Sequence, residues 1–401
     1  MEPRLENASA MYLERPKKRT ESLIRIFVLI GLIGAGVYFL SSTGPSTRPV
    51  TPTPAPTRTA SAYIADAEAS TRAGKFNDAI LAYKVAVSLE PDNAAIYPPL
   101  VRLTVYQSQG RKEQLLEALR MAQRAVRIAP DNAPIQAALA LTLDWNNQTV
   151  EAINTGRRAT QLDPNYAEGF AFLAEAYADG QNWPRAKDAI ETALKLNPSS
   201  LDAHRVNGYV LEAQGRFGEA ITAYQQALSL SPNAALLYLV IARNYRALGN
   251  YDAAINQYQR ALQLEPGRAD LQDELGNTLY LMYLTYTRPV DLERAIVVLE
   301  QAVKNSPDYA PAWAHLGLAY YARRNYEGVI ETLPKAIELG ANKIEYYYVL
   351  GLSYFYMDEC DTAMPLFQKA LAMDPNDVNA QGGINLCLHI TPTPLPPTRR
   401  P

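Results

Sequence analysis

The 401-residue sequence has few of the residues that build metal sites. It contains two cysteines, Cys360 and Cys387, and three histidines, His204, His315 and His389, too few and too scattered for a zinc site that is visible in a sequence. Lys and Arg (38) nearly balance Asp and Glu (41), and the basic residues form no stripe, so nothing favours a nucleic-acid partner. We therefore expect no metal and no nucleic acid.

Motifs that carry catalysis or hold a cofactor are also absent. The sequence has no GxxxxGK, no GxGxxG after a strand, no GxSxG and no HExxH. His204 and His315 stand alone in helical patterns, where a histidine is more often packed or solvated than catalytic. We expect a protein that is not an enzyme and binds no cofactor.

The only long apolar run lies near the N-terminus, LIRIFVLIGLIGAGVYFLSS at residues 23–42. It is long enough to cross a bilayer, with Arg25 reaching the interface. It therefore predicts a transmembrane signal anchor over residues 22–42. Six basic residues precede or begin this run and two follow it up to residue 60, which places the tail 1–21 in the cytoplasm and the remainder outside. A cleaved signal peptide, disfavoured by SSTGP after Leu40, and a buried core helix are the alternatives.

Two Thr/Pro segments, TPTPAPTRT (51–59) and TPTPLPPTRRP (391–401), bracket the rest of the chain. They favour extended polyproline II and cannot build a core. We interpret residues 43–59 as a linker and residues 391–401 as a disordered tail, although such a segment can also be a partner's ligand.

Between the brackets, short proline motifs recur with a period of 34 residues. From Pro130 to Pro266 four successive intervals are each 34 residues, and two other intervals carry insertions of five and seven. Within one period, Gly208 allows two helices to approach, Gly215 suits the turn between them, and Pro232 prevents the second helix from continuing. Each period therefore predicts a helix–turn–helix, and no strand pattern is present.

This pattern resembles the tetratricopeptide repeat (TPR) family, whose motif is W-x2-L-G-x2-Y…A-x3-F…P. AWAHLGLAYYARRNYEGVIETLPKAIELG carries Trp313, Leu316, Gly317, Tyr320 and Ala336 at the family's offsets. The resemblance implies an all-α fold, a right-handed α-solenoid of about nine repeats over residues 60–377, closed by a capping helix at 378–390.

Three local departures from the motif suggest less regular units. The first repeat has Asp66 and Ser70 where Leu and Tyr are usual, and the third has Gly156 where an aromatic residue would pack.

The resemblance also implies where a ligand would bind, because first-helix residues at repeat positions 2, 5, 6, 9, 12 and 13 line the concave face of the family's solenoids. These positions give acidic, then basic, then aromatic candidates along the chain. The candidates are Glu168, Glu175, Arg205, Tyr209, Arg243, Arg246, Tyr280, His315, Tyr321, Tyr348, Phe355 and Tyr356. A basic zone beside aromatic side chains suits an extended acidic peptide, unless the tyrosines merely pack neighbouring helices.

Two functions fit these features. The first is a membrane-tethered scaffold that binds a protein or peptide in the concave groove on the extracytoplasmic side. The second is an accessory subunit that positions an envelope enzyme of glycan or polymer export. The carboxylate clamp of chaperone-binding TPR proteins is not present, since the fifth repeat has Arg205 and Tyr209 and the sixth has Val240.

The two cysteines lie close together in the expected solenoid. Cys360 stands at a turn of the ninth repeat and Cys387 falls in the capping helix, which should pack on that repeat. In an exported chain they could form a disulfide, and otherwise they would be two small buried thiols.

Overall fold

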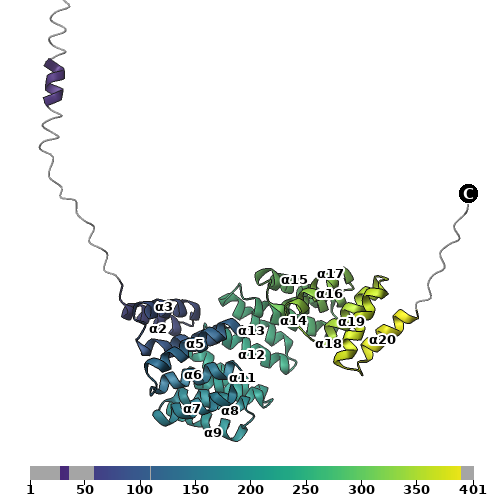
Figure 1. Ribbon diagram of the computed structural model, residues 1–401, viewed down its shortest axis with the longest axis horizontal. Coiled ribbons are helices and arrows are strands. Elements are labelled where there is room, and N and C mark those ends of the chain that lie inside the picture. Colours follow the sequence, from purple (N-terminus) through teal and green to yellow (C-terminus); the bar gives the residue numbers. More distant parts are fainter. Residues whose placement is uncertain (1–27, 36–57, 109, 390–401) are drawn as a thin grey trace, which may run out of the picture. The chain divides into compact units, whose positions relative to one another are not determined.

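Helices dominate the residues that the computed structural model describes, 28–35, 58–108 and 110–389, and no strand occurs among them (Figure 1). The chain divides into two units, residues 1–57 and 58–401. The second unit is a solenoid of antiparallel helix pairs, as the 34-residue period predicts. The expected tail 1–21 and the expected tail 391–401 lie outside the described residues.

In this unit, nine helix pairs follow one another along the chain. A short 3₁₀ turn, η1 (Ala94–Ile96), precedes the second pair. The pairs are α2 (Ala60–Arg72) with α3 (Phe76–Leu89), α4 (Tyr97–Gln107) with α5 (Lys112–Ile128), α6 (Ala133–Trp145) with α7 (Thr149–Leu162), α8 (Ala167–Asp179) with α9 (Trp183–Leu196), α10 (Leu201–Ala213) with α11 (Phe217–Leu230), α12 (Ala235–Ala247) with α13 (Tyr251–Leu264), α14 (Ala269–Tyr286) with α15 (Pro289–Asn305), α16 (Ala310–Ala322) with α17 (Tyr326–Glu338), and α18 (Ile344–Tyr356) with α19 (Cys360–Met373).

The helices of one pair approach closely because the first carries glycine where the second carries a large ring. A Cβ atom added to Gly208 in α10 would lie 2.6 Å from the ring of Tyr224 in α11, closer than non-bonded carbon atoms come. Gly215 in the turn between them has φ +74°, a conformation that glycine adopts without strain. Both glycines therefore have the roles that the sequence predicts.

The units with unusual motif residues are nevertheless regular helix pairs. Leu173 of α8, in the fourth repeat, packs against Gly156 of α7, in the third. It lies 3.2 Å from where a Cβ atom of residue 156 would be and fills space that an aromatic side chain would take. The seven-residue insertion lengthens α14 and α15 to 18 and 17 residues instead of forming a long loop.

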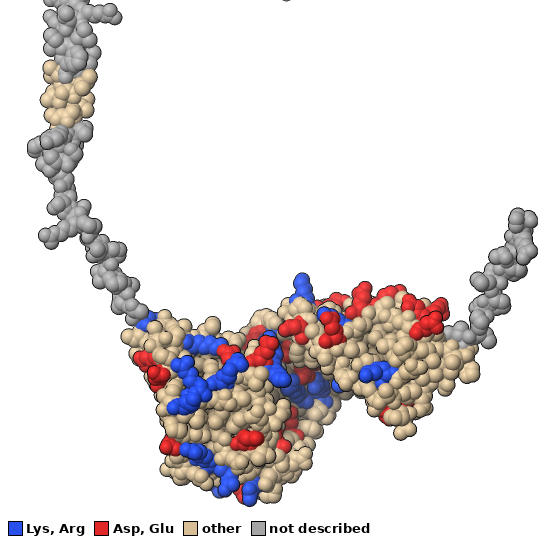
Figure 2. Space-filling model, in the orientation of Figure 1, with Lys and Arg blue, Asp and Glu red and all other residues tan. Residues whose placement is uncertain are grey.

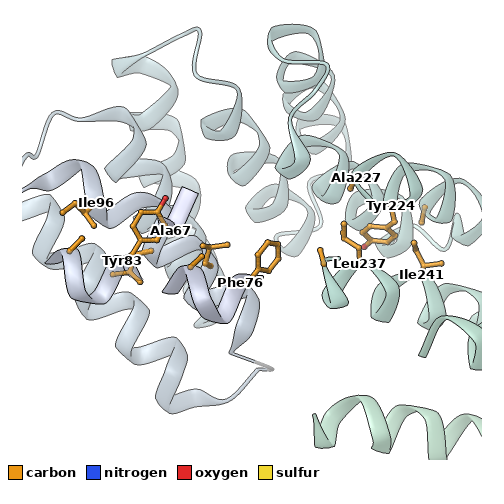
Figure 3. Packing of buried hydrophobic residues seen from close by; sticks show 14 of the residues in the cluster. Ala67, Phe76, Tyr83, Ile96, Tyr224, Ala227, Leu237 and Ile241 are labelled. Carbon is orange, nitrogen blue, oxygen red and sulfur yellow. The ribbon is translucent and has the colours of Figure 1, made fainter. Parts of the chain in front are cut away.

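The solenoid also makes a contact that the period does not predict, between its first and its fifth and sixth repeats. Phe76 of α3 shares one buried cluster with Tyr224 of α11 and Leu237 of α12 (Figure 3). The Asn233 side chain donates a hydrogen bond to the Ala73 carbonyl, 3.0 Å away. Since TPR units usually contact mainly their neighbours, this contact closes a turn of the solenoid onto itself.

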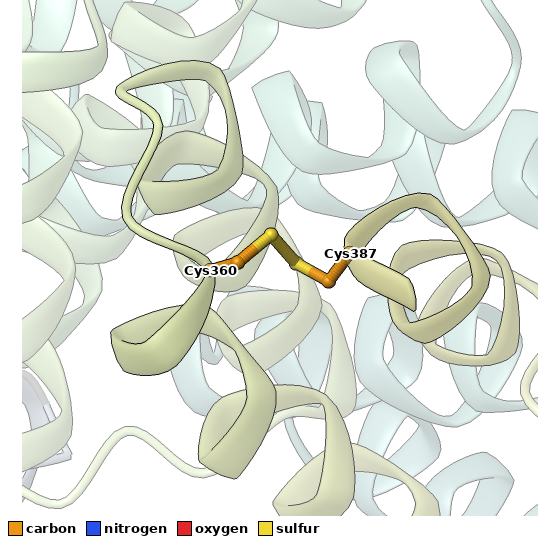
Figure 4. Close-up of a disulfide and its surroundings, with 2 residues drawn as sticks. All are labelled: Cys360 and Cys387. Carbon is orange, nitrogen blue, oxygen red and sulfur yellow. A yellow bond between two sulfur atoms is a disulfide. The ribbon is translucent and has the colours of Figure 1, made fainter. Parts of the chain in front are cut away.

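The C-terminal end is covered by α20 (Val378–Leu388), which lies against α18 and α19. Its packing depends on Phe367 of α19, whose ring contacts the backbone at Gly351 and Gly383. Cys360, the first residue of α19, forms a disulfide with Cys387 of α20, with Cα atoms 5.5 Å apart (Figure 4). Of the two alternatives for the cysteines, the structure therefore has the disulfide, which ties the cap to the last repeat.

In the first unit, residues 28–35 are helical and exposed. The other residues of the expected anchor 22–42, and nearly all of the linker 43–59, lie outside the described residues. Among the residues that are described, no helix combines the length and the apolar character needed to cross a membrane.

Candidate functional site

A network of buried charges lies between the first helices of the second to fifth repeats. Arg205 of α10 is 5% exposed, and its guanidinium donates two hydrogen bonds to Glu175 of α8, at 3.0 and 2.5 Å. Its Nε donates to the Tyr106 hydroxyl of α4, 3.0 Å away, and Trp145 Nε1 of α6 donates to the same Glu175 carboxylate. Arg205 and Glu175, both expected to face a ligand, instead satisfy each other inside the protein.

Asp202 extends this network across the closed turn. It accepts hydrogen bonds from the Tyr106 hydroxyl (2.5 Å) and from Arg102 of α4 (2.6 Å). Asp202 is 2% exposed, so this ion pair is protected from solvent and from screening by salt. Glu168, another expected groove residue, accepts a hydrogen bond from the Ser200 hydroxyl at 3.0 Å.

Beside this network the first helices of the third to sixth repeats leave a cavity of about 290 Å³. Carboxyl groups of Asp144, Glu175, Asp179 and Glu212 line it, against the guanidinium groups of Arg205 and Arg243. The rings of Trp145, Tyr209 and Tyr224 also contribute to its wall. The lining therefore carries more acidic than basic side chains.

Asp144 is the unusual member of this lining. It is 3% exposed, and neither of its carboxylate oxygens accepts a hydrogen bond from a protein donor. Burial, then the nearby Asp179 and Glu175, raise the pKa of Asp144 to about 9, with Arg205 opposing the shift. Burial also raises the pKa of Asp179, although the Tyr209 hydroxyl donates a hydrogen bond to it. Asp144 therefore holds a proton at neutral pH.

The expected basic zone is largely neutralised within the protein. Arg243 and Arg246 of α12 both bind Glu274 of α14, with shortest N–O distances of 2.6 and 2.5 Å. Burial opposes ionisation of Glu274, but the two arginines hold its pKa below the usual value. Two cations on one carboxylate leave a net positive charge, and Arg243 is 42% exposed, so this pair still faces solvent in part.

His315 of α16 also has a partner within the protein. Its Nδ1 lies 2.6 Å from Oδ1 of Asp273 on α14, a residue that is almost fully buried. Burial raises the pKa of Asp273, and His315 opposes the shift. This contact joins the first helices of the seventh and eighth repeats.

Five remaining candidates, together with one tyrosine that the sequence analysis did not select, form a surface that we call the aromatic surface. The candidates are Tyr280 of α14, Tyr321 of α16, and Tyr348, Phe355 and Tyr356 of α18, and the added residue is Tyr326 of α17.

Ring contacts run along this surface. Tyr326 and Tyr356 stack with centroids 4.8 Å apart, and Tyr356 meets Phe355 edge to face at 5.3 Å. Burial, then the surrounding tyrosines, raise the pKa of Tyr321 to about 12. Within the described part of the chain, the tyrosine hydroxyls of this surface make no hydrogen bond. The rings thus pack partly on the core and keep a polar edge free for water or a ligand.

The distribution of charge on the surface differs along the solenoid. On the face shown in Figure 2, acidic side chains gather along the edge formed by α15 and α17. The area over α18–α20 is mostly free of charged side chains.

Three residues of the cavity were not among the sequence candidates although the same signal marks them. Asp144 and Trp145 occupy positions 12 and 13 of the third repeat, and Asp179 occupies position 13 of the fourth. These are positions of the concave face. Their proximity to one another follows from the stacking of α6 and α8, which the period predicts.

Comparison with known proteins supports the repeat assignment. Sequence profiles described as tetratricopeptide repeat or TPR repeat match residues 173–235, 242–282, 291–342 and 344–377. Mouse superkiller complex protein 3 is 30% identical over 107 residues, which are 25% of this chain and 7% of that protein. Human protein O-mannosyl-transferase TMTC1 is 33% identical over 116 residues, 29% of this chain and 12% of that protein. The chain thus matches only a small part of the length of these relatives.

Solved structures show the same fold. The Cut9–Hcn1 hetero-tetramer of the APC/C matches with a TM-score of 0.55 and 18% identity, covering 82% of this chain and 76% of that one. A monomeric mutant of IFIT1 with Gppp-AAAA matches with a TM-score of 0.51 and 16% identity, covering 82% and 80%. Fold and profiles together support the tetratricopeptide repeat family, and the residues that the profiles cover are tetratricopeptide repeats.

Proposed function

We propose that this protein is a membrane-tethered scaffold that binds a protein or peptide on the aromatic surface of its seventh to ninth repeats. The observation that carries the proposal is the set of partly exposed rings of the aromatic surface, whose tyrosine hydroxyls have no partner among the described residues. Such rings give a ligand broad apolar contact and lose little side-chain entropy on binding. Tetratricopeptide repeats are suited to protein–protein interaction because their solenoid presents an extended concave face.

The charges of the solenoid favour a peptide over a nucleic acid. The cavity of the third to sixth repeats has an excess of carboxyl groups, which would repel phosphates. The partly exposed pair of Arg243 and Arg246 could still bind an acidic side chain of a peptide, because their shared Glu274 neutralises only one of the two charges. The similarity to IFIT1 supports the fold and gives no information on the ligand of this protein.

The tether and its orientation rest on the sequence and on the disulfide. The apolar run at 23–42 and the basic residues before it favour an anchor with the solenoid on the extracytoplasmic side. The Cys360–Cys387 bond supports that side, because disulfides persist in oxidising compartments. An accessory subunit of a glycan- or polymer-export enzyme is the alternative, and the identity of the partner decides between them.

Site-specific photocrosslinking in intact membranes tests the proposal. A photoreactive phenylalanine analogue would replace Tyr356 of the aromatic surface, or Tyr286 of α14 as the matched control. The two tyrosines are 50% and 52% exposed, so the probe is equally accessible at both. We expect a discrete protein adduct from position 356 and none from position 286. An adduct only at 286 would move the site to the lengthened end of α14, and adducts at neither would remove the support for this surface.

A further inference from the structure

The cavity beside the buried charge network has the features of a binding site that is separate from the aromatic surface. It lies between the first helices of the third to sixth repeats and has a volume of about 290 Å³. That volume suits one side chain or a small molecule and not a folded partner. Its walls combine carboxyl groups with the faces of Trp145, Tyr209 and Tyr224.

Most carboxyl and guanidinium groups of the cavity have a hydrogen-bond partner, but Asp144 has none. Arg205 and Glu175 bind each other through two hydrogen bonds. Glu212 accepts hydrogen bonds from the Tyr224 hydroxyl (2.8 Å) and from the Asn244 amide (2.9 Å).

Asp144 and Asp179 lie in the same lining with no cation bound to either. Arg243, the other guanidinium of the lining, is bound to Glu274 of α14. The acidic pair therefore lacks the counterion that a buried carboxylate requires.

The surroundings of the two carboxyl groups indicate which kind of ligand the cavity would bind. Asp144 is almost fully buried with both oxygens unpartnered, whereas Asp179 is exposed and receives only the Tyr209 hydroxyl. A cation that enters past Asp179 would reach Asp144 and replace the proton that Asp144 holds. The Trp145 ring would add attraction for a cation through its π face.

The chemistry of the lining favours an organic cation over a metal ion. No group of three or more His, Cys, Asp or Glu side chains that could hold a metal occurs among the described residues. Two carboxylates and aromatic walls are, in contrast, the usual surroundings of a bound ammonium group. We propose that this cavity binds an aliphatic ammonium group, as a lysine side chain or a free diamine carries, with Asp144 and Asp179 as its counterions.

Titration calorimetry on the full chain in detergent tests this site with three probes. Cadaverine represents a free diamine. Nα-acetyl-lysine amide, whose ε-ammonium group is free, represents a peptide side chain, and Nα-acetyl-norleucine amide has the aliphatic chain without the charge. We expect one or both ammonium probes to bind and the norleucine probe to give no heat. Binding of cadaverine alone indicates a free amine as the source, and binding of the lysine probe indicates a peptide. Equal binding of the norleucine probe, or no binding of any probe, would overturn the proposal.

Proton release on binding distinguishes a specific site from non-specific electrostatic attraction. At about pH 8, binding should release protons, because the ammonium displaces the proton that Asp144 holds. Glu175 and Arg205 also face this pair, and they form an ion pair with each other. The proton count comes from repeating the titration in two buffers of different ionisation enthalpy, and a count of zero would contradict the displacement.

Matched variants complete the test. Asp144→Asn keeps the shape of the side chain and should weaken ammonium binding about tenfold or more. Asp92→Asn changes an exposed carboxyl of the loop before η1 and should leave the affinity unchanged. If tryptophan fluorescence also reports binding, the signal should come from Trp145 in the cavity wall. Trp145→Phe should therefore abolish the fluorescence change while retaining part of the affinity. Full affinity in Asp144→Asn, with unchanged helix content, would show that the cation binds elsewhere.

Discussion

Replacing Asp144 by Asn should change how stability depends on pH. Burial, then Asp179 and Glu175, raise the pKa of Asp144 to about 9, far above the usual value of 3.8. Between these two values the folded protein holds a proton that the unfolded chain has released. Stability that this proton contributes is complete at low pH and is lost as the pH rises toward about 9. The amide that the substitution introduces never titrates, and it can donate a hydrogen bond to Asp179 instead.

The size of the effect follows from the linkage between protons and folding. While only the folded state holds the proton, the free energy of unfolding falls by at most about 1.4 kcal/mol per pH unit. Relative to Asp144→Asn, the unmodified protein should therefore lose stability steadily from about pH 5 to about pH 8. The variant should be the more stable protein at the alkaline end, although it lacks a carboxyl group.

Urea unfolding at several pH values measures this difference. Tryptophan fluorescence is a suitable probe because Trp145 lies next to Asp144 and donates a hydrogen bond to Glu175, and far-UV circular dichroism reports the solenoid as a whole. Asp92→Asn is the control and should run parallel to the unmodified protein. If the stability curves of Asp144→Asn and the unmodified protein stay parallel across the range, Asp144 is ionised in the folded state and does not hold this proton.

Three other outcomes are expected. Arg205→Leu should lower stability by about 3–5 kcal/mol in urea unfolding, since the buried Glu175 would lose its guanidinium partner and keep only the hydrogen bond from Trp145; a loss below about 1 kcal/mol would show that water reaches this pair. Gly208→Ala should lower stability by about 1–3 kcal/mol because the added methyl meets the Tyr224 ring, and an unchanged stability would mean that the helices separate freely. Protease outside intact cells or spheroplasts should degrade residues 60–390 and spare the N-terminal 20; a protected solenoid would reverse the proposed orientation.

Local sequence patterns predict the helix pairs but not the closure of the solenoid. The 34-residue period, the close approach at Gly208 and the cap at α20 are set by residues near one another in the chain, so the sequence shows them. The contact of Phe76 with the fifth and sixth repeats depends on small rotations that accumulate over several units. No sequence motif indicates this accumulated rotation.

In the candidate site, too, the sequence predicts the local features but not the long-range contacts. Repeat positions place Arg205 and Glu175 on the concave face, as the resemblance implies. They do not show that α4 approaches α10 closely enough for Tyr106 to bind Arg205, which helps to bury that arginine. The aromatic candidates lie on neighbouring repeats, where local stacking decides contact, and there the structure brings Tyr321, Tyr326 and Tyr356 together as one surface.

The affinity of the crosslinked partner for variants of the aromatic surface tests the central proposal most directly. Tyr348→Ala and Tyr356→Ala should each weaken binding by about 1–3 kcal/mol, with helix content unchanged. Tyr286→Ala, which removes an equally exposed ring from α14, should leave the affinity within about twofold of the unmodified protein. If both aromatic-surface variants keep full affinity for the partner, the concave aromatic surface is not its binding site.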